Sequence, residues 1–455
     1  MKYATHYDRM TRQPIPTLLL QLSIPTIISM LVTNIYNMAD TAFVGRLGTS
    51  ASGAVGVVFG YMAILQAIGF LFGQGAGSIL ARRLGAKDAE GATVTASTGF
   101  FCALFFSIAA AILSFLFLDP LVRLLGSTET IAPYAKTYIF YILLSAPVMV
   151  TSFTMNNLLR YEGKAMLGMI GMMTGALLNI GGDALFMFVF HLGIAGAGLS
   201  TCLSQYVGFA ILLSMFLRGK TQSRLSLRKV SLGHGRFFDI TTTGFPSLLR
   251  QGLNSLTTIL LNMESAVYGD AAVAAMSIVS RIIFFVFSVA LGIGQGFQPI
   301  SSFNYGARKY GRLRRAFRVT FLVAEAIMAL FTLVVYSQSG SMIALFRDDP
   351  EVIAIGTRAL RLQLLAQLVL PFQMCVEMLH QSTGQRLGAA VLSGCRSGFI
   401  FIPLLLILAP LRGLSGIQEA QPLAFLITLI PAFYFAIRYF RELPQEDEAP
   451  RAARG

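Results

Sequence analysis

The sequence contains no tryptophan, only four cysteines and four histidines, and few charged residues, which make up 12% of the chain. The cysteines lie singly in apolar segments without a CxxC pair, so nothing indicates a disulfide framework or a thiolate metal site. The histidines are scattered, and the HExxH, GxSxG and phosphate-binding-loop motifs do not occur. These absences argue against an enzyme and against a nucleotide-driven pump, and no cofactor is expected.

Hydrophobic residues make up 55% of the sequence and gather in runs of twenty or more. Each run is long enough to cross a hydrocarbon core of about 30 Å as a helix, which predicts an all-α integral membrane protein. Residues 1–14 are polar and lead directly into the first run, so no cleavable signal is expected. We expect twelve transmembrane helices, near residues 15–44, 52–80, 93–118, 135–158, 166–190, 194–217, 239–267, 272–300, 316–336, 356–381, 387–409 and 416–438.

The net charge of +14 is distributed unevenly along the chain. Most Lys and Arg residues lie in the tails and in loops such as "ARRLGAKDAEG", "RGKTQSRLSLRKV" and "ARKYGRLRRAFR", which the twelve helices place on one side. Positive loops stay in the cytoplasm, so this asymmetry predicts cytoplasmic termini and an inner-membrane protein. The basic residues therefore indicate topology and contact with the bilayer, and no nucleic-acid partner is expected.

Residues of the first half recur in the second half at a constant distance along the chain. We call this distance, which separates Pro25 from Pro246, the repeat offset. By the same offset, Gly73-Gln74-Gly75 recurs as Gly294-Gln295-Gly296, Gly48 as Gly269 and Gly163 as Gly384, after which the register slips by one at Gly193 and Gly413. We expect two six-helix lobes, residues 1–217 and 239–440, with a basic linker at 218–238 and a polar tail at 441–455. Six is an even number, so the lobes insert in parallel, as in alternating-access transporters. We expect the protein to act as a monomer.

Asp40 lies in the apolar run "SMLVTNIYNMADTAFVGRLG" and shares one helix face with Thr33, Tyr36 and Asn37. An acid at the centre of a membrane helix costs about 2.5–3.5 kcal/mol on insertion scales, so it should face the interior of the bundle. A similar polar face comprises Asn179 and Asp183, four residues apart. The following helix offers Thr201 and Gln205 at the same spacing.

"NIYNMADTAFVGRLG" together with "GQGAGSILARRLGAKD" and "FPSLLRQGLNSLTTILLNMESAVYGDAAVAAMSIVSRI" resembles the multidrug and toxic compound extrusion (MATE) transporters, in particular the bacterial multidrug-export branch. The resemblance covers roughly residues 15–440. It implies a secondary antiporter that exports organic, mostly cationic compounds in exchange for Na⁺ or H⁺. It also implies that Asp40, Asn179, Asp183 and Thr201 correspond to the family's acidic and amide cluster, which is its cation or proton site.

The chemistry of these four side chains suits either coupling ion. Na⁺ prefers oxygen ligands, which Asp40, Asn179, Asp183 and Thr201 can supply, and Tyr36 lies on the face of Asp40. Without a metal, two carboxylates in a low-dielectric pocket resist ionising together, so one of them can carry a proton. The alternative is that these residues only join neighbouring helices.

The second half contains two further intramembrane acids, Glu264 and Glu377. At the repeat offset, Glu264 aligns with Phe43, one turn beyond Asp40, and some family members use an acid there for cation or substrate binding. The alternative for both acids is a structural ion pair with Arg250, Arg281 or Arg396, which also lie within apolar runs. Glu377 aligns with Asn156, and we expect Asn156, Asn157 and Glu377 to contribute to substrate binding.

Aromatic and flexible side chains supply further candidates for substrate binding. One face of the fourth predicted helix carries Tyr134, Tyr138, Tyr141 and Ser145. The next helical hairpin is rich in methionine, with Met155, Met166, Met169, Met172 and Met173. Aromatic faces attract organic cations, and methionines adapt to varied shapes. We expect Tyr138, Tyr141 and Met173 to contact substrate, whereas helix packing is the alternative for each.

One competing function remains open at this stage. A flippase for lipid-linked sugars, or an exporter of another amphipathic metabolite, would favour a strongly cationic cavity. The apolar segments contain the acids Asp40, Asp183, Glu264 and Glu377 and the bases Arg250, Arg281 and Arg396, so the cavity is not expected to be strongly cationic. This balance favours drug export.

Overall fold

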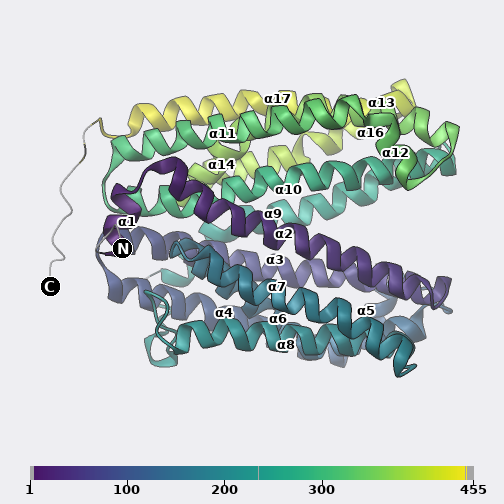
Figure 1. The fold of residues 1–455 in the computed structure, drawn as a ribbon, viewed down its shortest axis with the longest axis horizontal. Coiled ribbons are helices and arrows are strands. Elements are labelled where there is room, and N and C mark those ends of the chain that lie inside the picture. The colour runs from purple at the N-terminus through teal and green to yellow at the C-terminus, as the bar shows by residue number, and fades with distance from the viewer. Residues whose placement is uncertain (1–4, 234, 446, 448–455) are drawn as a thin grey trace. The chain divides into compact units, whose positions relative to one another are not determined.

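The computed structural model describes residues 5–233, 235–445 and 447, and among them it contains helices and loops but no β-strand (Figure 1). The elements of the first half are α1 (His6–Arg12), α2 (Ile15–Gly45), α3 (Thr49–Gly85), α4 (Ala89–Leu116), α5 (Leu118–Leu124), α6 (Ala132–Tyr161), α7 (Ala165–Asp183), η1 (Ala184–Val189), α8 (Gly193–Leu217) and η2 (Leu227–Lys229). Those of the second half are α9 (Arg236–Ala266), α10 (Asp270–Gly306), α11 (Tyr310–Ser337), α12 (Ser339–Phe346), α13 (Pro350–Gln367), α14 (Leu370–Thr383), α15 (Arg386–Gly394), η3 (Cys395–Phe399), α16 (Phe401–Arg412) and α17 (Leu414–Glu442).

Ten helical segments of the described residues are long and apolar enough to cross a membrane, and an eleventh is the pair α13 and α14, bent by 50°. The remaining long helix, α9, is as long as α2 but includes Asp239, Arg250 and Glu264. The predicted all-α membrane fold is therefore confirmed. Of the predicted polar tail, residues 446 and 448–455 lie outside the described residues.

The internal repeat is visible in the helix boundaries. The repeat offset carries both ends of α2, α3 and α4 onto the ends of α9, α10 and α11, respectively. The turns repeat as well, because Gly163 and Gly384 adopt φ values of 74° and 87°. This left-handed conformation is open to glycine and disfavoured for other residues, which explains why glycine recurs at the offset.

The chain divides into two compact units whose borders fall inside helices. Of the described residues, the N-terminal unit contains 28–248, and the C-terminal unit contains those up to 27 and those from 249 to 447. The borders lie within α2 and α9, and the repeat offset carries the first border onto the second. Each unit therefore includes the first part of a helix whose remainder belongs to the other unit. We call these segments, residues 15–27 of α2 and 236–248 of α9, the exchanged half-helices.

Glycines allow the exchanged half-helices to pack closely. In the N-terminal unit, a Cβ at Gly75 of α3 would overlap the carbonyl oxygen of Ile240, and one at Gly244 would overlap that of Leu71. At the repeat-related crossing in the C-terminal unit, a Cβ at Gly296 of α10 would overlap Ser23 of α2. The backbones of the crossing helices therefore approach more closely than side chains would permit.

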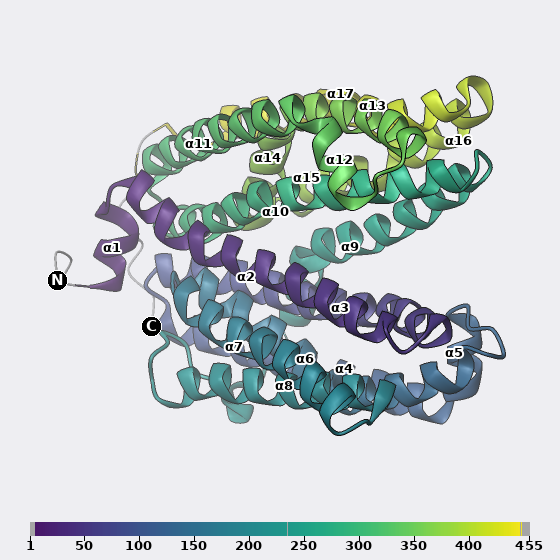
Figure 2. The same ribbon diagram turned by 45° about the vertical axis from the view of Figure 1, so that its right-hand side comes forward.

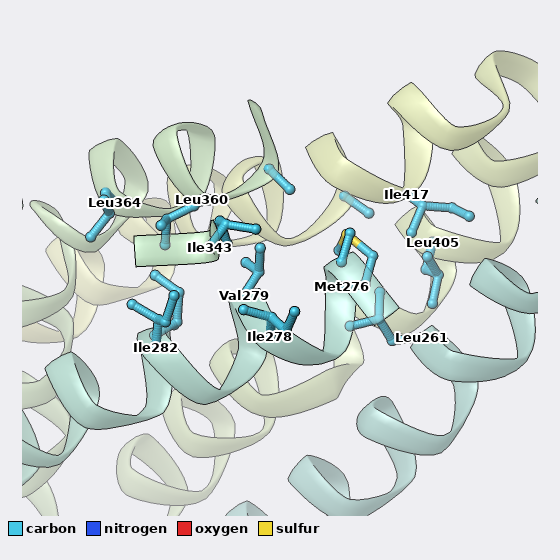
Figure 3. Close-up of a cluster of buried hydrophobic side chains, with 14 of the residues drawn as sticks. Leu261, Met276, Ile278, Val279, Ile282, Ile343, Leu360, Leu364, Leu405 and Ile417 are labelled. Carbon is cyan, nitrogen blue, oxygen red and sulfur yellow. The ribbon is translucent and has the colours of Figure 1, made fainter. Parts of the chain in front are cut away.

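Within the N-terminal unit, α3, α4, α6, α7 and α8 pack side by side, as Figures 1 and 2 show. The C-terminal unit has a cluster of buried apolar side chains from α9, α10, α11, α12, α13, α16 and α17 (Figure 3). Leu261, Met276, Val279, Leu360 and Leu405 belong to this apolar cluster. It joins segments that are far apart in the sequence.

The basic segment after α8 is attached to the N-terminal unit. The buried carboxylate of Glu162, just beyond α6, accepts hydrogen bonds from the backbone N–H groups of Gln222 (2.7 Å) and Ser223 (2.9 Å). Burial raises the pKa of Glu162, while these donors oppose the shift. Ser97 also accepts a hydrogen bond from the N–H of Ser226. Hydrogen bonds to Glu162 and to Ser97 therefore hold this segment against the N-terminal unit.

Candidate functional site

The candidate site of the N-terminal unit begins with Asp40 on α2, whose residue is only 7% exposed. The hydroxyl of Tyr138, from α6, donates a hydrogen bond to Oδ2 of Asp40 at 3.2 Å. Tyr138 is itself buried. The structure thus brings together two side chains that are far apart in the sequence and belong to different helices.

Asn179 of α7 organises the second part of this site. Its Nδ2 donates to Oγ1 of Thr201 on α8 at 3.1 Å and to Oδ1 of Asp183 at 3.4 Å. Ser200 contributes a hydroxyl that donates to the backbone carbonyl of Asn179 at 3.0 Å. Asp183 is the last residue of α7 and directly precedes the π-helix η1. Such π-helical turns are rare and often occur at functional sites.

Three oxygen atoms of this cluster are buried without any hydrogen-bond partner in the described structure: Oδ1 of Asp40, Oδ2 of Asp183 and Oδ1 of Asn179. The carboxyl groups of Asp40 and Asp183 are close enough to interact with each other. A buried acceptor without a donor destabilises a protein by about 1–3 kcal/mol. A proton shared by the carboxyls, or a bound cation, would remove this deficit. The geometry of the cluster therefore leaves acceptor oxygens that a proton or a small cation can bind.

A small pocket of about 30 Å³ adjoins the cluster. This volume exceeds the roughly 10–15 Å³ that one water molecule needs, so the pocket has room for a water molecule or a small ion. No group of three or more His, Cys, Asp or Glu residues that could hold a metal occurs in the described chain, so a cation here would have mixed carboxyl, amide and hydroxyl ligands. The polar residues that line the pocket are Thr33, Tyr36, Ser152, Asn179, Thr201, Ser204 and Gln205.

The other predicted substrate residues of the N-terminal unit lie outside this pocket. Tyr141 packs against Gly198 of α8, and Asn156 packs against Gly168 of α7. The Asn157 side chain is occupied, because its Nδ2 donates to the carbonyl of Phe153 at 2.7 Å and its Oδ1 accepts from Arg160 at 2.5 Å. Met173 is half-buried, and its neighbour Met172 lines the pocket instead.

In the C-terminal unit, Glu377 forms two buried ion pairs. Its Oε1 accepts from Nη1 of Arg250 at 2.8 Å, and its Oε2 accepts from Nη2 of Arg396 at 2.6 Å. Glu264 is half-buried, and within the described residues its carboxylate makes no ion pair. Arg281 is exposed. Of the two acids predicted as possible ion-pair partners, Glu377 takes this role.

Sequence reasoning missed two parts of these sites. Ser200 was not singled out, although it precedes Thr201 and bonds to Asn179. The simultaneous pairing of Glu377 with both Arg250 and Arg396 was also not predicted, because α9, α14 and η3 are far apart in the sequence. The sequence shows which polar residues lie in apolar segments, but it does not show which of them contact each other.

A sequence model of the family MatE matches residues 25–185 and 246–407 of this chain. The chain belongs to the MatE family. The two matches begin at Pro25 and Pro246, which the repeat offset relates, so the family's unit occurs once in each half. The resemblance inferred from the sequence is confirmed.

Members of the MatE family with known names and structures resemble the chain over nearly its whole length. "Multidrug export protein MepA" of Staphylococcus saprophyticus is 28% identical over 415 residues, which covers 91% of this chain and 92% of the relative. The protein of the same name from Staphylococcus aureus (strain MSSA476) is 26% identical over 407 residues, covering 89% and 90% of the two chains. The structure described as "Crystal structure of MATE in complex with MaL6" matches with a TM-score of 0.90 and 25% identity, covering 96% of this chain and 99% of that one.

Proposed function

We propose that this MatE-family protein is a secondary antiporter that exports bulky organic, mostly cationic compounds in exchange for H⁺ or Na⁺. The observation that carries the proposal is the buried cluster of Asp40, Asn179 and Asp183, with three oxygen atoms that lack hydrogen-bond partners in the described structure. The relatives named as multidrug export proteins support the choice of organic drugs and toxins as substrates.

In this proposal, Asp40 and Asp183 form the coupling site, and the residues around them hold it in place. Tyr138 fixes one oxygen of Asp40, and Thr201 and Ser200 fix Asn179. With its Nδ2 engaged in this way, Asn179 keeps Oδ1 available for a cation. A proton would instead be shared by the two carboxyl groups. Tyr36, which lines the adjoining pocket, completes the coupling site.

Ion binding at this site can drive export through differential affinity. With the site empty, two carboxylates repel each other; with a proton or Na⁺ bound, that repulsion disappears and α2, α6 and α7 can pack differently. A ligand shifts such an equilibrium only by as much as it prefers one state over the other. Exchange then requires that the ion-bound state release the substrate, which corresponds to a coupling free energy of about 1–3 kcal/mol.

Export of a fluorescent cation from proteoliposomes tests the proposal. Ethidium efflux should follow an imposed pH gradient or an imposed sodium gradient, and the gradient that drives it identifies the coupling ion. Liposomes without protein provide the control. Absence of efflux under both gradients, together with protein-dependent movement of a lipid-linked sugar, would replace antiport of drugs by the flippase function.

A further inference from the structure

A second and larger pocket lies in the C-terminal unit, with a volume of about 190 Å³. It is formed by residues of α9, α10, α13, η3, α16 and α17. Four phenylalanines, Phe284, Phe287, Phe401 and Phe425, contribute to its walls. Its polar lining includes Asn254, Thr257, Gln363, Gln367, Arg396 and Ser397. No Asp or Glu is among its lining residues.

This pocket is the repeat counterpart of the pocket beside Asp40. Residues of the small pocket reappear in the large one at the repeat offset, or at one position less after the slip in register. The pairs are Thr33 with Asn254, Tyr36 with Thr257, Gly175 with Arg396, Ala176 with Ser397, Thr201 with Gln421 and Gln205 with Phe425. The two pockets therefore occupy corresponding places in the two units.

The two pockets differ in the charged groups at or beside them. The counterpart of Asp40 is Leu261, which belongs to the apolar cluster of Figure 3 and also lines the large pocket. The counterpart of Gly175 is Arg396, whose guanidinium lies 5.6 Å from the ring centroid of Phe287. The C-terminal unit thus has an apolar residue where the N-terminal unit has Asp40, and it has a base, Arg396, where the N-terminal unit has Gly175.

The positive charge of Arg396 is only partly neutralised. Arg250 and Arg396 share the single carboxylate of Glu377, so the three buried groups carry a net charge of +1. Nε and Nη2 of Arg396 bond to Glu377, whereas no acceptor for its Nη1 occurs in the described part of the chain. A buried charge of this kind is stable only when a partner compensates it.

Two neutral lining residues have unused hydrogen-bonding capacity. Ser397 is 5% exposed and Gln367 is 1% exposed. The hydroxyl oxygen of Ser397 and Oε1 of Gln367 are buried without a hydrogen-bond partner in the described structure. The pocket thus combines an incompletely paired guanidinium, a free hydroxyl and a free amide, all of which can act on one small polar ligand.

We propose that this pocket binds an aromatic organic anion, a carboxylate or sulfonate attached to a single ring. Arg396 would pair with the acidic group, and the hydroxyl of Ser397 would donate a hydrogen bond to it. Gln367 would donate through Nε2 after its amide group rotates, so that Nε2 takes the place of the buried Oε1. The phenylalanines would hold the ring. A cavity of roughly 150 Å³ holds benzene, so about 190 Å³ suits a ring with one acidic substituent. The inference goes beyond the export of cations and does not depend on the Asp40 site.

Equilibrium binding of radiolabelled benzoate to the purified full-length protein in detergent tests this inference. Benzoate should bind saturably and be displaced by benzenesulfonate, whereas the isosteric benzamide and the cation benzylamine should not displace it. Binding should survive in Asp40→Asn, which separates this site from the coupling site. Absence of saturable binding, or equal displacement by benzamide, would overturn the proposal, and displacement by phosphatidylglycerol but not benzenesulfonate would assign the pocket to a lipid headgroup.

Variants of the lining residues locate the site. Arg396→Gln should weaken benzoate binding by about tenfold or more, since a charge-assisted hydrogen bond is lost. Glu377 then still pairs with Arg250, so a neutral buried pair remains. Ser397→Ala and Gln367→Met should each weaken binding several-fold without disturbing the ion pairs, and they decide the matter if Arg396→Gln does not fold. Arg281→Gln, which removes an exposed charge from α10, is the matched control and should bind normally. Unchanged affinity in Ser397→Ala and Gln367→Met would contradict the site.

Discussion

The two carboxyl oxygens of Asp40 have different surroundings. One of its oxygens accepts a hydrogen bond from Tyr138, and the other is buried without a partner in the described structure. The first contact fixes the orientation of the carboxyl group, and the second leaves an oxygen for a proton or cation. Substitution of Asp40 and substitution of Tyr138 therefore test the binding function and the orienting hydrogen bond separately.

Removing the ionisable group should abolish coupling. Asp40→Asn keeps the size of the side chain, so we expect ethidium efflux in proteoliposomes to fall about tenfold or more while the protein still folds. Asp183→Asn should behave alike. The double variant should lose little more, because groups that act as one unit are not additive. Thermal denaturation of the purified variants provides the folding control, and full efflux by folded Asp40→Asn would contradict the assignment.

Removing the donor should alter the pH dependence and leave transport itself intact. The Tyr138 hydroxyl stabilises the ionised carboxylate of Asp40, so its loss in Tyr138→Phe favours the protonated form. If protons are the coupling ion, the efflux profile should move to higher pH. Tyr141→Phe is the matched control, since Tyr141 packs against Gly198. A Tyr138→Phe profile identical to that of the unmodified protein would show that this hydrogen bond has no part in coupling.

At the scale of the element, the sequence predicts the long apolar helices but not the bends and π-helices, which depend on tertiary contacts. Apolar runs predicted the positions of α2, α3 and α4 closely, because length and hydropathy alone decide whether a helix spans a bilayer. The 50° bend between α13 and α14 and the π-helices η1 and η3 were not predicted. They arise where tertiary packing overrides local preference, which a single sequence does not display.

The candidate sites likewise combine residues that the sequence identifies with contacts that only the structure shows. Asp40, Asn179, Asp183 and Thr201 could be selected from the sequence because polar groups in apolar helices are expensive and therefore conspicuous. The contact between Tyr138 and Asp40 joins helices that are distant along the chain, and the large pocket of the C-terminal unit draws on six elements. The repeat offset was the available signal for that pocket, since it carries Thr33 onto Asn254 and Tyr36 onto Thr257.

The crossing of α3 and α9 should depend on one glycine. A methyl group in Gly244→Ala would overlap the carbonyl oxygen of Leu71, so the helices must separate, and we expect a loss of about 1–3 kcal/mol in stability. Gly252→Ala, later in α9, meets no atom within 4 Å and is the matched control. It should leave stability unchanged or raise it by roughly 0.5–1 kcal/mol. The melting temperatures of the two purified variants measure the difference, and equal values would contradict close packing at Gly244.

At the scale of the whole molecule, the orientation in the membrane follows from charge. The loops that contain most of the Lys and Arg residues should face the cytoplasm together with both termini. In a variant without native cysteines, single cysteines at Ser226 and Lys309 should react with membrane-impermeant reagents only from the cytoplasmic side. Those at Thr49 and Asp349 should react only from outside. External labelling at Ser226 would overturn this topology.

The exchanged half-helices impose an order on biosynthesis. Residues 15–27 leave the ribosome first, but α10, against which they pack, is made only after residue 270. The surface of α3 around Gly75 likewise waits for residues 236–248. A fragment that ends at residue 233 should therefore be degraded when produced alone and rescued by co-expression of residues 235–455, as pulse-chase labelling would show. We therefore expect neither half of the chain to be stable alone, although the internal repeat indicates that the two halves arose by duplication.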